Sequence, residues 1–270
     1  LLTRDVAAAW LGLHLAAKLL DDLQDGDNSI LGVSFPPRAP MNLALALVFA
    51  AQRCVALGPD AGLSAERSSA QAVISDACLE VVSGQHLSLL PNAEGDPLAV
   101  SWEIARSKGG IPFSLACRLG AMSVGAPQEV IEGLARYGEC VGDAVQVVDD
   151  AAGVRHREVA DLSSRTGSLA VAYAFSVAEA DDRAQLEELW SRLGRGEAGA
   201  GEAVWQALEA AGCLRYLSVM ATAKALEARQ ALVALGDRLN AGGKEKLLQV
   251  TEWLDPTVGE GRVGLPVGDA

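Results

Sequence analysis

Two clusters of aspartates are the residues whose types and spacing best suit chemistry. Asp21, Asp22 and Asp25 close an apolar stretch with helical periodicity, so they occupy positions i, i+1 and i+4 within one turn. Like charges at this spacing repel, and negative charge at a helix C-terminus opposes the macrodipole, so helix stability does not explain the cluster. Mg²⁺ would explain it, because this ion takes a carboxylate or two and bridges them to phosphate oxygens. The alternative is a solvated helix end.

The second cluster is Asp149 and Asp150, which follow an apolar run that contains Gln146. Buried carboxylates without a partner are costly, and a metal shared with the first cluster would supply that partner. Gln146 lies one turn earlier, within reach to orient a carboxylate or a water. The alternative is again a helix end, here emerging toward Arg155 and Arg157. Because both clusters close long apolar stretches, we favour metal binding for both.

Helical periodicity dominates the chain, and no stretch alternates as a strand would, so the predicted fold class is all-α. None of the segments rich in Gly and Pro is long enough to be a domain linker. We therefore expect one antiparallel helical bundle over 1–254 and a flexible tail over 255–270. The predicted helices are 3–25, 40–57, 63–90, 97–122 with a break near 109–112, 127–153, 166–179, 181–193, 200–210, 213–240 and 242–254.

Composition excludes several classes of protein. A net charge of -13 offers no basic surface for nucleic acid. The longest apolar run, from Leu43 to Ala51, is too short to span a bilayer, so we do not expect an integral membrane protein. The five cysteines show no C-x-x-C spacing, which is typical of buried thiols in a reducing compartment, and we expect a cytoplasmic protein.

The motifs resemble, in kind and in order, those of the trans-type polyprenyl diphosphate synthases and their terpene-synthase relatives. The matching segments are Asp21 to Gly26, Ser83-Gly84-Gln85, Lys108 with the apolar segment ending at Ala116 to Ala121, Gln146 to Asp150, and Asp161-Leu162 with Ser168-Leu169 and Tyr173-Ala174.

This resemblance implies an isoprenoid synthase fold, an allylic isoprenoid diphosphate as substrate, and a homodimer. It also implies three Mg²⁺ ions, bridged by the substrate's pyrophosphate and held by the five aspartates of the two motifs. Gln85, Lys108 and Gln146 become substrate-binding candidates. The aspartates become the catalytic residues, because bound metal stabilises the charge that develops on the departing pyrophosphate.

The departures from the family pattern concern mostly the second substrate. The family's Arg-Arg-Gly, which grips isopentenyl diphosphate, corresponds here to Ile30, Leu31 and Gly32. Aliphatic side chains cannot replace two guanidiniums on a pyrophosphate. The second motif also lacks its last acid, because Ala151-Ala152-Gly153 follows the aspartate pair, and Thr166 stands where the family has a basic residue before Ser168. The family's upstream basic motif would lie before Leu1.

Three functions are compatible with this pattern. We favour a terpene cyclase that ionises one allylic diphosphate of C15 to C20 or longer. The first alternative is a prenyltransferase that condenses an allylic diphosphate with isopentenyl diphosphate or another acceptor. The second is a catalytically weak subunit of such an enzyme, although the five surviving aspartates argue against complete inactivity.

Four further residues have two interpretations each. Ala16 and Ala17 occupy the positions where bulky residues floor the family's pocket and stop chain growth, which indicates a deep pocket, unless alanine is merely common in this chain. Lys18 lies on the acidic face, where it either binds diphosphate or neutralises the carboxylates. Asp143, one turn before Gln146, either steadies a carbocation or makes a polar contact in the core, and we favour the core contact.

Overall fold

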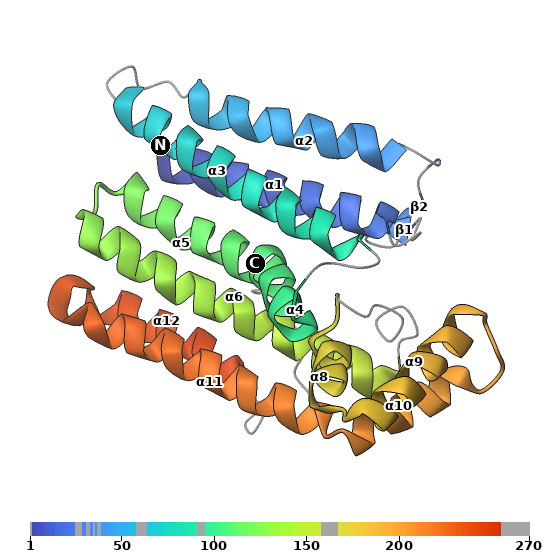
Figure 1. Ribbon diagram of the computed structural model, residues 1–270. Coiled ribbons are helices and arrows are strands. Elements are labelled where there is room, and N and C mark those ends of the chain that lie inside the picture. The colour runs from blue at the N-terminus through green and yellow to red at the C-terminus, as the bar shows by residue number, and fades with distance from the viewer. Residues whose placement is uncertain are drawn as a thin grey trace. The chain divides into compact units, whose positions relative to one another are not determined.

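The computed structural model describes residues 2–24, 29–30, 33–34, 36, 39–57, 64–90, 95–157 and 167–254. Helices make up almost all of these residues, so the all-α prediction is confirmed (Figure 1). The α-helices are α1 Leu2–Gln24, α2 Ala39–Ala56, α3 Ser64–Ser88, α4 Pro97–Ala105, α5 Ile111–Ser123, α6 Gln128–His156, α8 Leu169–Val177, α9 Ala180–Gly194, α10 Ala200–Ala210, α11 Cys213–Ala234 and α12 Ala241–Trp253. Two short helices, η2 Arg106–Gly110 and η3 Gly236–Arg238, and a two-residue antiparallel ladder, β1 Ser29–Ile30 with β2 Val33–Ser34, complete the described elements.

The chain divides into two compact units. Unit 1 comprises Leu1–Leu79 and Ser114–Ala135, and unit 2 comprises Glu80–Phe113 and Arg136–Ala270. The boundaries fall inside α3, α5 and α6, so these three helices contribute residues to both units. A single domain over 1–254 stays a prediction, and the tail over 255–270 lies outside the described residues.

Unit 1 contains α1, α2 and the first part of α3, together with most of α5 and the start of α6. Small residues allow α1 and α2 to pack closely, with Ala16, Leu19 and Ala44 in the buried layer between them. A buried ion pair fixes α3 to both helices. The Arg67 guanidinium donates from Nη2 to Asp5 Oδ2 of α1 at 2.9 Å and from Nη1 to the carbonyl oxygen of Val55 in α2 at 2.7 Å.

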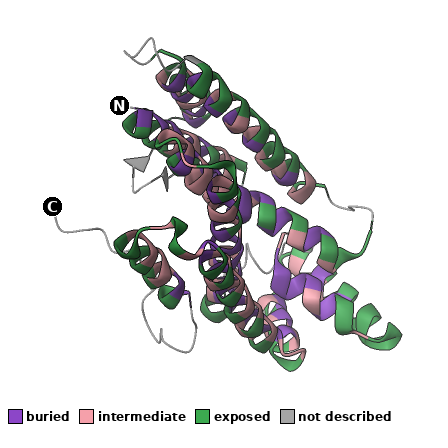
Figure 2. Ribbon diagram, turned by 90° about the vertical axis from the view of Figure 1, so that its left-hand side faces the viewer, coloured by how far each residue is buried: buried purple, intermediate pink, exposed green. Residues whose placement is uncertain are grey.

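Unit 2 has its core around α8, a helix that is apolar on every side. Six of its residues, Leu169, Ala170, Val171, Ala172, Ala174 and Phe175, are buried. They pack with Val147 of α6, Trp190 of α9, Val204 of α10 and Leu217 of α11. Figure 2 colours the buried residues of the described chain purple. A helix that is hydrophobic all round must be covered on all sides, and α8 is central for this reason.

The predicted break near residues 109–112 is instead a wide helical turn. Asp96 caps the N-terminus of α4 by accepting a hydrogen bond from the Ala99 amide. After α4, the chain continues through the π-helical segment η2, in which the Ile111 amide donates to the carbonyl oxygen of Arg106 five residues earlier. Pro112 follows directly. In a regular α-helix, a proline ring collides with the carbonyl group one turn before it. We attribute the continuation of the helix through Pro112 to the wider π turn, which moves that carbonyl group away.

The predicted helix over 213–240 ends earlier, at Ala234 of α11. Gly236 has a positive φ of 56°, a conformation that glycine adopts without steric cost. The chain therefore leaves the α-helix here, as helices commonly do at a left-handed glycine.

One face of α2 is apolar and exposed. Met41, Leu45 and Phe49 recur every four residues, and their exposed fractions are 48%, 50% and 70%. Among the described helices, α2 is also the one whose length and hydropathy would allow it to cross a membrane, although a helix of a non-membrane protein can meet the same criterion. The absence of a membrane span stays a prediction.

Candidate active site

The first acidic cluster lies in the last turn of α1, in unit 1. Asp22 is buried and Asp21 is half-buried. Lys18 Nζ lies 2.6 Å from Asp22 Oδ1, and the Lys18 side chain is 60% exposed. Of the two roles considered for Lys18, neutralising the carboxylates is the one that this contact supports. Asp25 lies outside the described residues.

The two alanines before this cluster have different environments. Ala16 is buried against α2, next to Leu19 and Ala44. Ala17 is exposed, one turn before Asp21 on the same helix face. Of the two, Ala17 is the alanine whose side chain is open to a ligand.

The second acidic cluster lies late in α6, in unit 2, and its two carboxylates differ. Asp149 is exposed. Asp150 accepts two hydrogen bonds, one at Oδ1 from Gln146 Nε2 at 3.3 Å and one at Oδ2 from the Leu169 amide at 2.6 Å. Leu169 begins α8, whose N-cap residue Ser168 provides no side-chain hydrogen bond of its own. Asp150 therefore takes the place of an N-cap side chain and binds α6 to the start of α8.

Lys108 lies at the centre of η2, which packs closely between α3 and α6. A Cβ atom added at Gly109 would overlap the carbonyl oxygen of Gly142, and one added at Gly142 would overlap the carbonyl oxygen of Gly109. On the other side, a Cβ atom at Gly84 would overlap the side chain of Ser107. These contacts place the backbone of η2 directly against α6 and its Ser107 side chain directly against α3.

These contacts bring together the segments that carry the three predicted substrate-binding residues. Gln85 follows Gly84 of α3, and Lys108 precedes Gly109 of η2. Gln146 lies one turn after Gly142 on α6, and its Cβ is 3.3 Å from a Cβ built at Gly109. All of these residues belong to unit 2. The positions of the side chains at a bound substrate stay a prediction.

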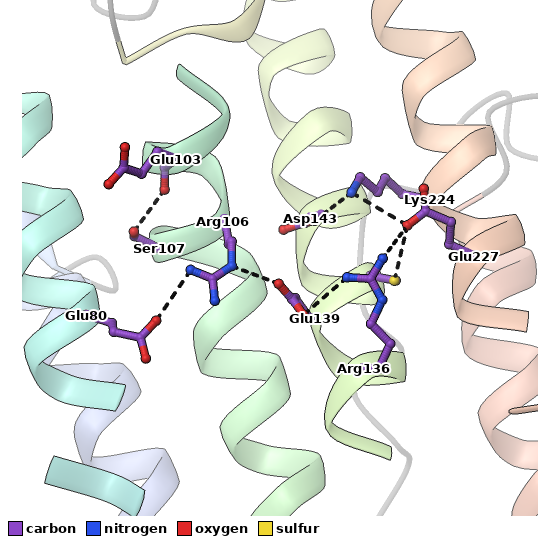
Figure 3. A network of polar contacts seen from close by, with 10 residues as sticks. Glu80, Glu103, Arg106, Ser107, Arg136, Glu139, Asp143, Lys224 and Glu227 are labelled. Carbon is purple, nitrogen blue, oxygen red and sulfur yellow. Dashed lines mark hydrogen bonds and ion pairs between the residues drawn. The ribbon is translucent and has the colours of Figure 1, made fainter. Parts of the chain in front are cut away.

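A network of ion pairs surrounds η2 (Figure 3). Arg106 Nε donates to Glu139 Oε1 of α6 at 2.8 Å, and Arg106 Nη1 lies 3.4 Å from Glu80 Oε2 of α3. Arg136, one turn before Glu139, lies 3.3 Å from the other oxygen of that carboxylate. Burial would raise the pKa of Glu139, but the hydrogen bond and charge of Arg106, aided by Arg136, hold it below its ordinary value.

The sequence alone did not reveal this network. Arg106 and Glu139 are 33 positions apart, and neither belongs to a local motif. The one available signal was the spacing of Glu139, Gly142, Asp143 and Gln146, which share one face of a helix.

Asp143 makes the polar core contact that its position predicted. Its Oδ2 lies 3.0 Å from Lys224 Nζ of α11. Its other oxygen, Oδ1, is buried, has no hydrogen-bond partner among the described residues, and lies 2.5 Å from where a Cβ of Gly110 would be. Burial raises the pKa of Asp143, and the Lys224 ammonium opposes this rise. The ion pair connects α11 to the same face of α6 that contacts η2.

The acidic residues fit Mg²⁺ by their chemistry. Within the described ranges, no group of three or more potential ligands is gathered at one point. Mg²⁺ does not require such a group, because it commonly takes one or two protein carboxylates and completes its coordination with water and phosphate oxygens. Asp21 and Asp22 in one unit and Asp149 in the other are carboxylates of this kind. Asp150 already has a structural partner at each oxygen.

The all-helical fold and the acidic clusters in α1 and α6 are those expected of the isoprenoid synthase class. The chain belongs to the polyprenyl synthetase family, whose model matches residues 2–210. It is 32% identical over 145 residues to the nonaprenyl diphosphate synthase of Mycobacterium tuberculosis, a match that covers 51% of this chain and 41% of the relative. It is 26% identical over 186 residues to the geranylgeranyl diphosphate synthase of Methanosarcina mazei, covering 67% of this chain and 56% of the relative. The chain thus spans about half the length of the curated relatives it matches.

Solved structures confirm the fold. The polyprenyl synthetase of Streptomyces coelicolor A3(2) superposes with a TM-score of 0.78 at 20% identity, covering 93% of this chain and 78% of the other. The geranylgeranyl pyrophosphate synthase of Lactobacillus brevis gives a TM-score of 0.79 at 21% identity with the same coverage. The isoprenoid synthase type of bundle predicted from the motifs is therefore the fold of this chain.

Proposed function

We propose that the protein is a Mg²⁺-dependent prenyltransferase that joins an allylic isoprenoid diphosphate to isopentenyl diphosphate or another acceptor. The chain belongs to the polyprenyl synthetase family. The observation that carries the proposal is that the segment bearing Lys108 packs against the face of α6 on which Gly142 and Asp149 lie. The relatives are named as diphosphate synthases, which favours transfer over the cyclisation that the sequence alone favoured.

The residues have separate tasks in this proposal. Asp21, Asp22 and Asp149 hold the metal, which when bound supplies positive charge to the departing pyrophosphate. Lys108 adds a fixed positive charge for the same pyrophosphate. Asp150 holds α6 against α8 and contributes to the site through that contact. Asp25 retains its predicted role as a ligand.

Substrate ionisation also requires a dry environment. An allylic carbocation reacts with any water that reaches it, so the hydrocarbon chain must lie among apolar side chains. In this proposal the alanine- and leucine-rich helices supply such walls, and the small, exposed Ala17 stands at the floor position one turn before Asp21. The predicted allylic chain of C15 to C20 or longer rests on this small residue.

Cyclisation remains a second candidate, because Ile30 and Leu31 replace the arginines that hold isopentenyl diphosphate in the resembled family. Under this alternative, the same metal and lysine ionise the allylic diphosphate, and the cation closes on itself. The third possibility, a weak partner subunit, predicts binding of pyrophosphate without turnover.

For the partner, we propose a second copy of this chain. The exposed Met41, Leu45 and Phe49 of α2 form an apolar stripe of the kind that marks an interface. Light scattering on the purified protein tests the homodimer, and a mass of one chain at micromolar concentration would contradict it. A cytoplasmic location stays a prediction.

The deciding experiment is product analysis. The protein is incubated with Mg²⁺ and geranyl, farnesyl or geranylgeranyl diphosphate, with and without isopentenyl diphosphate, and the products are identified by mass spectrometry. A longer diphosphate that forms only with isopentenyl diphosphate supports transfer to that acceptor. A hydrocarbon or alcohol that forms equally without it would overturn transfer in favour of cyclisation. Mg²⁺-dependent binding of pyrophosphate without any product would indicate a partner subunit, and Asp149→Asn is the matched inactive control.

A further inference from the structure

We propose that Arg106 is a positioning residue for Lys108, acting by locking the π-helical segment η2 between α3 and α6. The inference rests on the proposed function, because it assumes that Lys108 contacts the pyrophosphate. It concerns residues outside both acidic motifs, and Arg106 acts here through the backbone of η2.

The segment η2 has a wide, π-helical conformation. Its hydrogen bond from the Ile111 amide to the Arg106 carbonyl spans five residues, one more than in an α-helix. Such wide turns are less favourable than α-helix and recur at functional sites. Relaxation to an α-helix would change the direction of the residues beyond it by about 100°, the rotation per residue of a helix. Lys108 lies within the wide turn itself, so its direction relative to α4 and α5 also depends on the turn staying open.

The packing of η2 supplies part of that constraint. On one side Ser107 fills the space left by Gly84, and on the other Gly109 lies against Gly142. Both contacts need glycine, and both fail if η2 shifts by the width of a methyl group. Since Gly142 and Asp150 are two turns apart on α6, the contact fixes the backbone beside Lys108 relative to the second acidic cluster.

Arg106 supplies the second constraint on the position of η2. It is the first residue of η2, and its guanidinium reaches Glu139 of α6 and Glu80 of α3 at the same time. A planar guanidinium can bridge two carboxylates on separate helices, whereas a lysine ammonium on its single flexible stem cannot reproduce that geometry. Arg106 thereby ties η2 to both neighbours at the end opposite the contact between Gly109 and Gly142.

Exposure makes the idea testable without unfolding the protein. The side chains of Arg106 and Glu80 are 46% and 51% exposed, and Glu139 is 21% exposed. Ion pairs this exposed contribute little to global stability. A loss of ligand affinity on removing Arg106 would therefore reflect the placement of η2, and a loss of folding would not be expected.

The experiment is a double-mutant cycle on the binding of inorganic pyrophosphate in the presence of Mg²⁺, measured by isothermal titration calorimetry. The variants are Arg106→Gln, Lys108→Ala and the double variant. The matched control is Arg136→Gln, because Arg136 contacts the same Glu139 carboxylate without belonging to η2. Thermal unfolding of each variant is recorded in parallel.

We expect Arg106→Gln to weaken pyrophosphate binding about tenfold, because the Lys108 ammonium is still present and is only misplaced. Its Tm should change by about 3 °C or less. In the Lys108→Ala background the same substitution should have no further effect, because its action passes through Lys108. Arg136→Gln should bind as the wild type does.

Three results would overturn the inference while leaving the proposed function intact. They are unchanged binding by Arg106→Gln, an equal loss in the Lys108→Ala background, which would make Arg106 a direct ligand, and an equal loss in Arg136→Gln. If the wild type does not bind pyrophosphate with Mg²⁺, or if Lys108→Ala binds as well as the wild type, the proposed role of Lys108 fails and the inference fails with it.

Discussion

Asp150 holds the N-terminus of α8, and its replacement should separate a capping role from a metal-binding role. The carboxylate accepts from the Leu169 amide at 2.6 Å and from Gln146 at 3.3 Å. Its neighbour Asp149 is exposed on the same helix. Asp150→Ala and Asp150→Asn are the informative changes, with Asp149→Asn as the matched control.

The magnitude follows from the contacts. A hydrogen bond from a backbone amide to a charged carboxylate contributes about 1.5–3 kcal/mol, and replacing a helix N-cap by alanine costs about 0.5–2 kcal/mol. We therefore expect Asp150→Ala to lower the free energy of unfolding by about 2 kcal/mol. Asp150→Asn keeps an oxygen acceptor and loses only the charge at the helix N-terminus, a cost of about 0.3–1 kcal/mol. Asp149→Asn, at an exposed site, should change stability by about 0.5 kcal/mol or less.

Urea denaturation at neutral pH measures the stabilities, and calorimetry with Mg²⁺ and pyrophosphate measures binding. We expect the two Asn variants to have opposite effects on binding and on stability. Asp149→Asn should lose most of the binding and little stability, whereas Asp150→Asn should lose some stability and keep most of the binding. If Asp150→Asn instead abolishes binding at unchanged stability, Asp150 is a ligand and the capping interpretation is wrong.

Two further predictions concern unit 1. Ala16→Phe should lower the free energy of unfolding, measured by urea denaturation, by about 1–3 kcal/mol, because it overpacks the layer between α1 and α2. Ala17→Phe should leave the stability unchanged and shorten the prenyl product identified by mass spectrometry. A product of unchanged length from a stable Ala17→Phe protein would remove Ala17 from the pocket. Arg67→Ala should cost about 3–5 kcal/mol, because it leaves the Asp5 carboxylate buried without its charge partner; a loss below about 1 kcal/mol would show that water or another group compensates.

The helices were largely predictable from the sequence. The predicted spans 3–25, 40–57 and 200–210 correspond within one residue at each end to α1, α2 and α10. Apolar periodicity and the turn residues between segments are local properties, so they need no knowledge of distant contacts. Two of the misjudged places were Pro112, where a wide turn continues the helix, and Gly236, just before which α11 ends. The outcome at both positions depends on the backbone conformation, and the residue type alone does not determine that conformation.

The acidic clusters and Gln146 were visible in the sequence as polar groups following apolar stretches, and the resemblance to the family added Gln85 and Lys108. The sequence did not distinguish Ala16 from Ala17, or Asp149 from Asp150. Ala16 and Ala17 are chemically identical, and only the position of α2 makes one buried and the other exposed.

By itself, the sequence determined the helical fold class, the chemistry of the acidic clusters and the membership of a family whose motifs it carries. Tertiary structure decided what each group does with that chemistry. The Asp150 carboxylate caps α8 because the Leu169 amide, 19 residues away, comes within 2.6 Å of it. Arg106 bridges Glu80 and Glu139 because two glycine contacts bring three helices together. Periodicity encodes which face a helix buries, but the partner of a polar side chain depends on distances between segments far apart in the chain, and these exist only once the helices have packed.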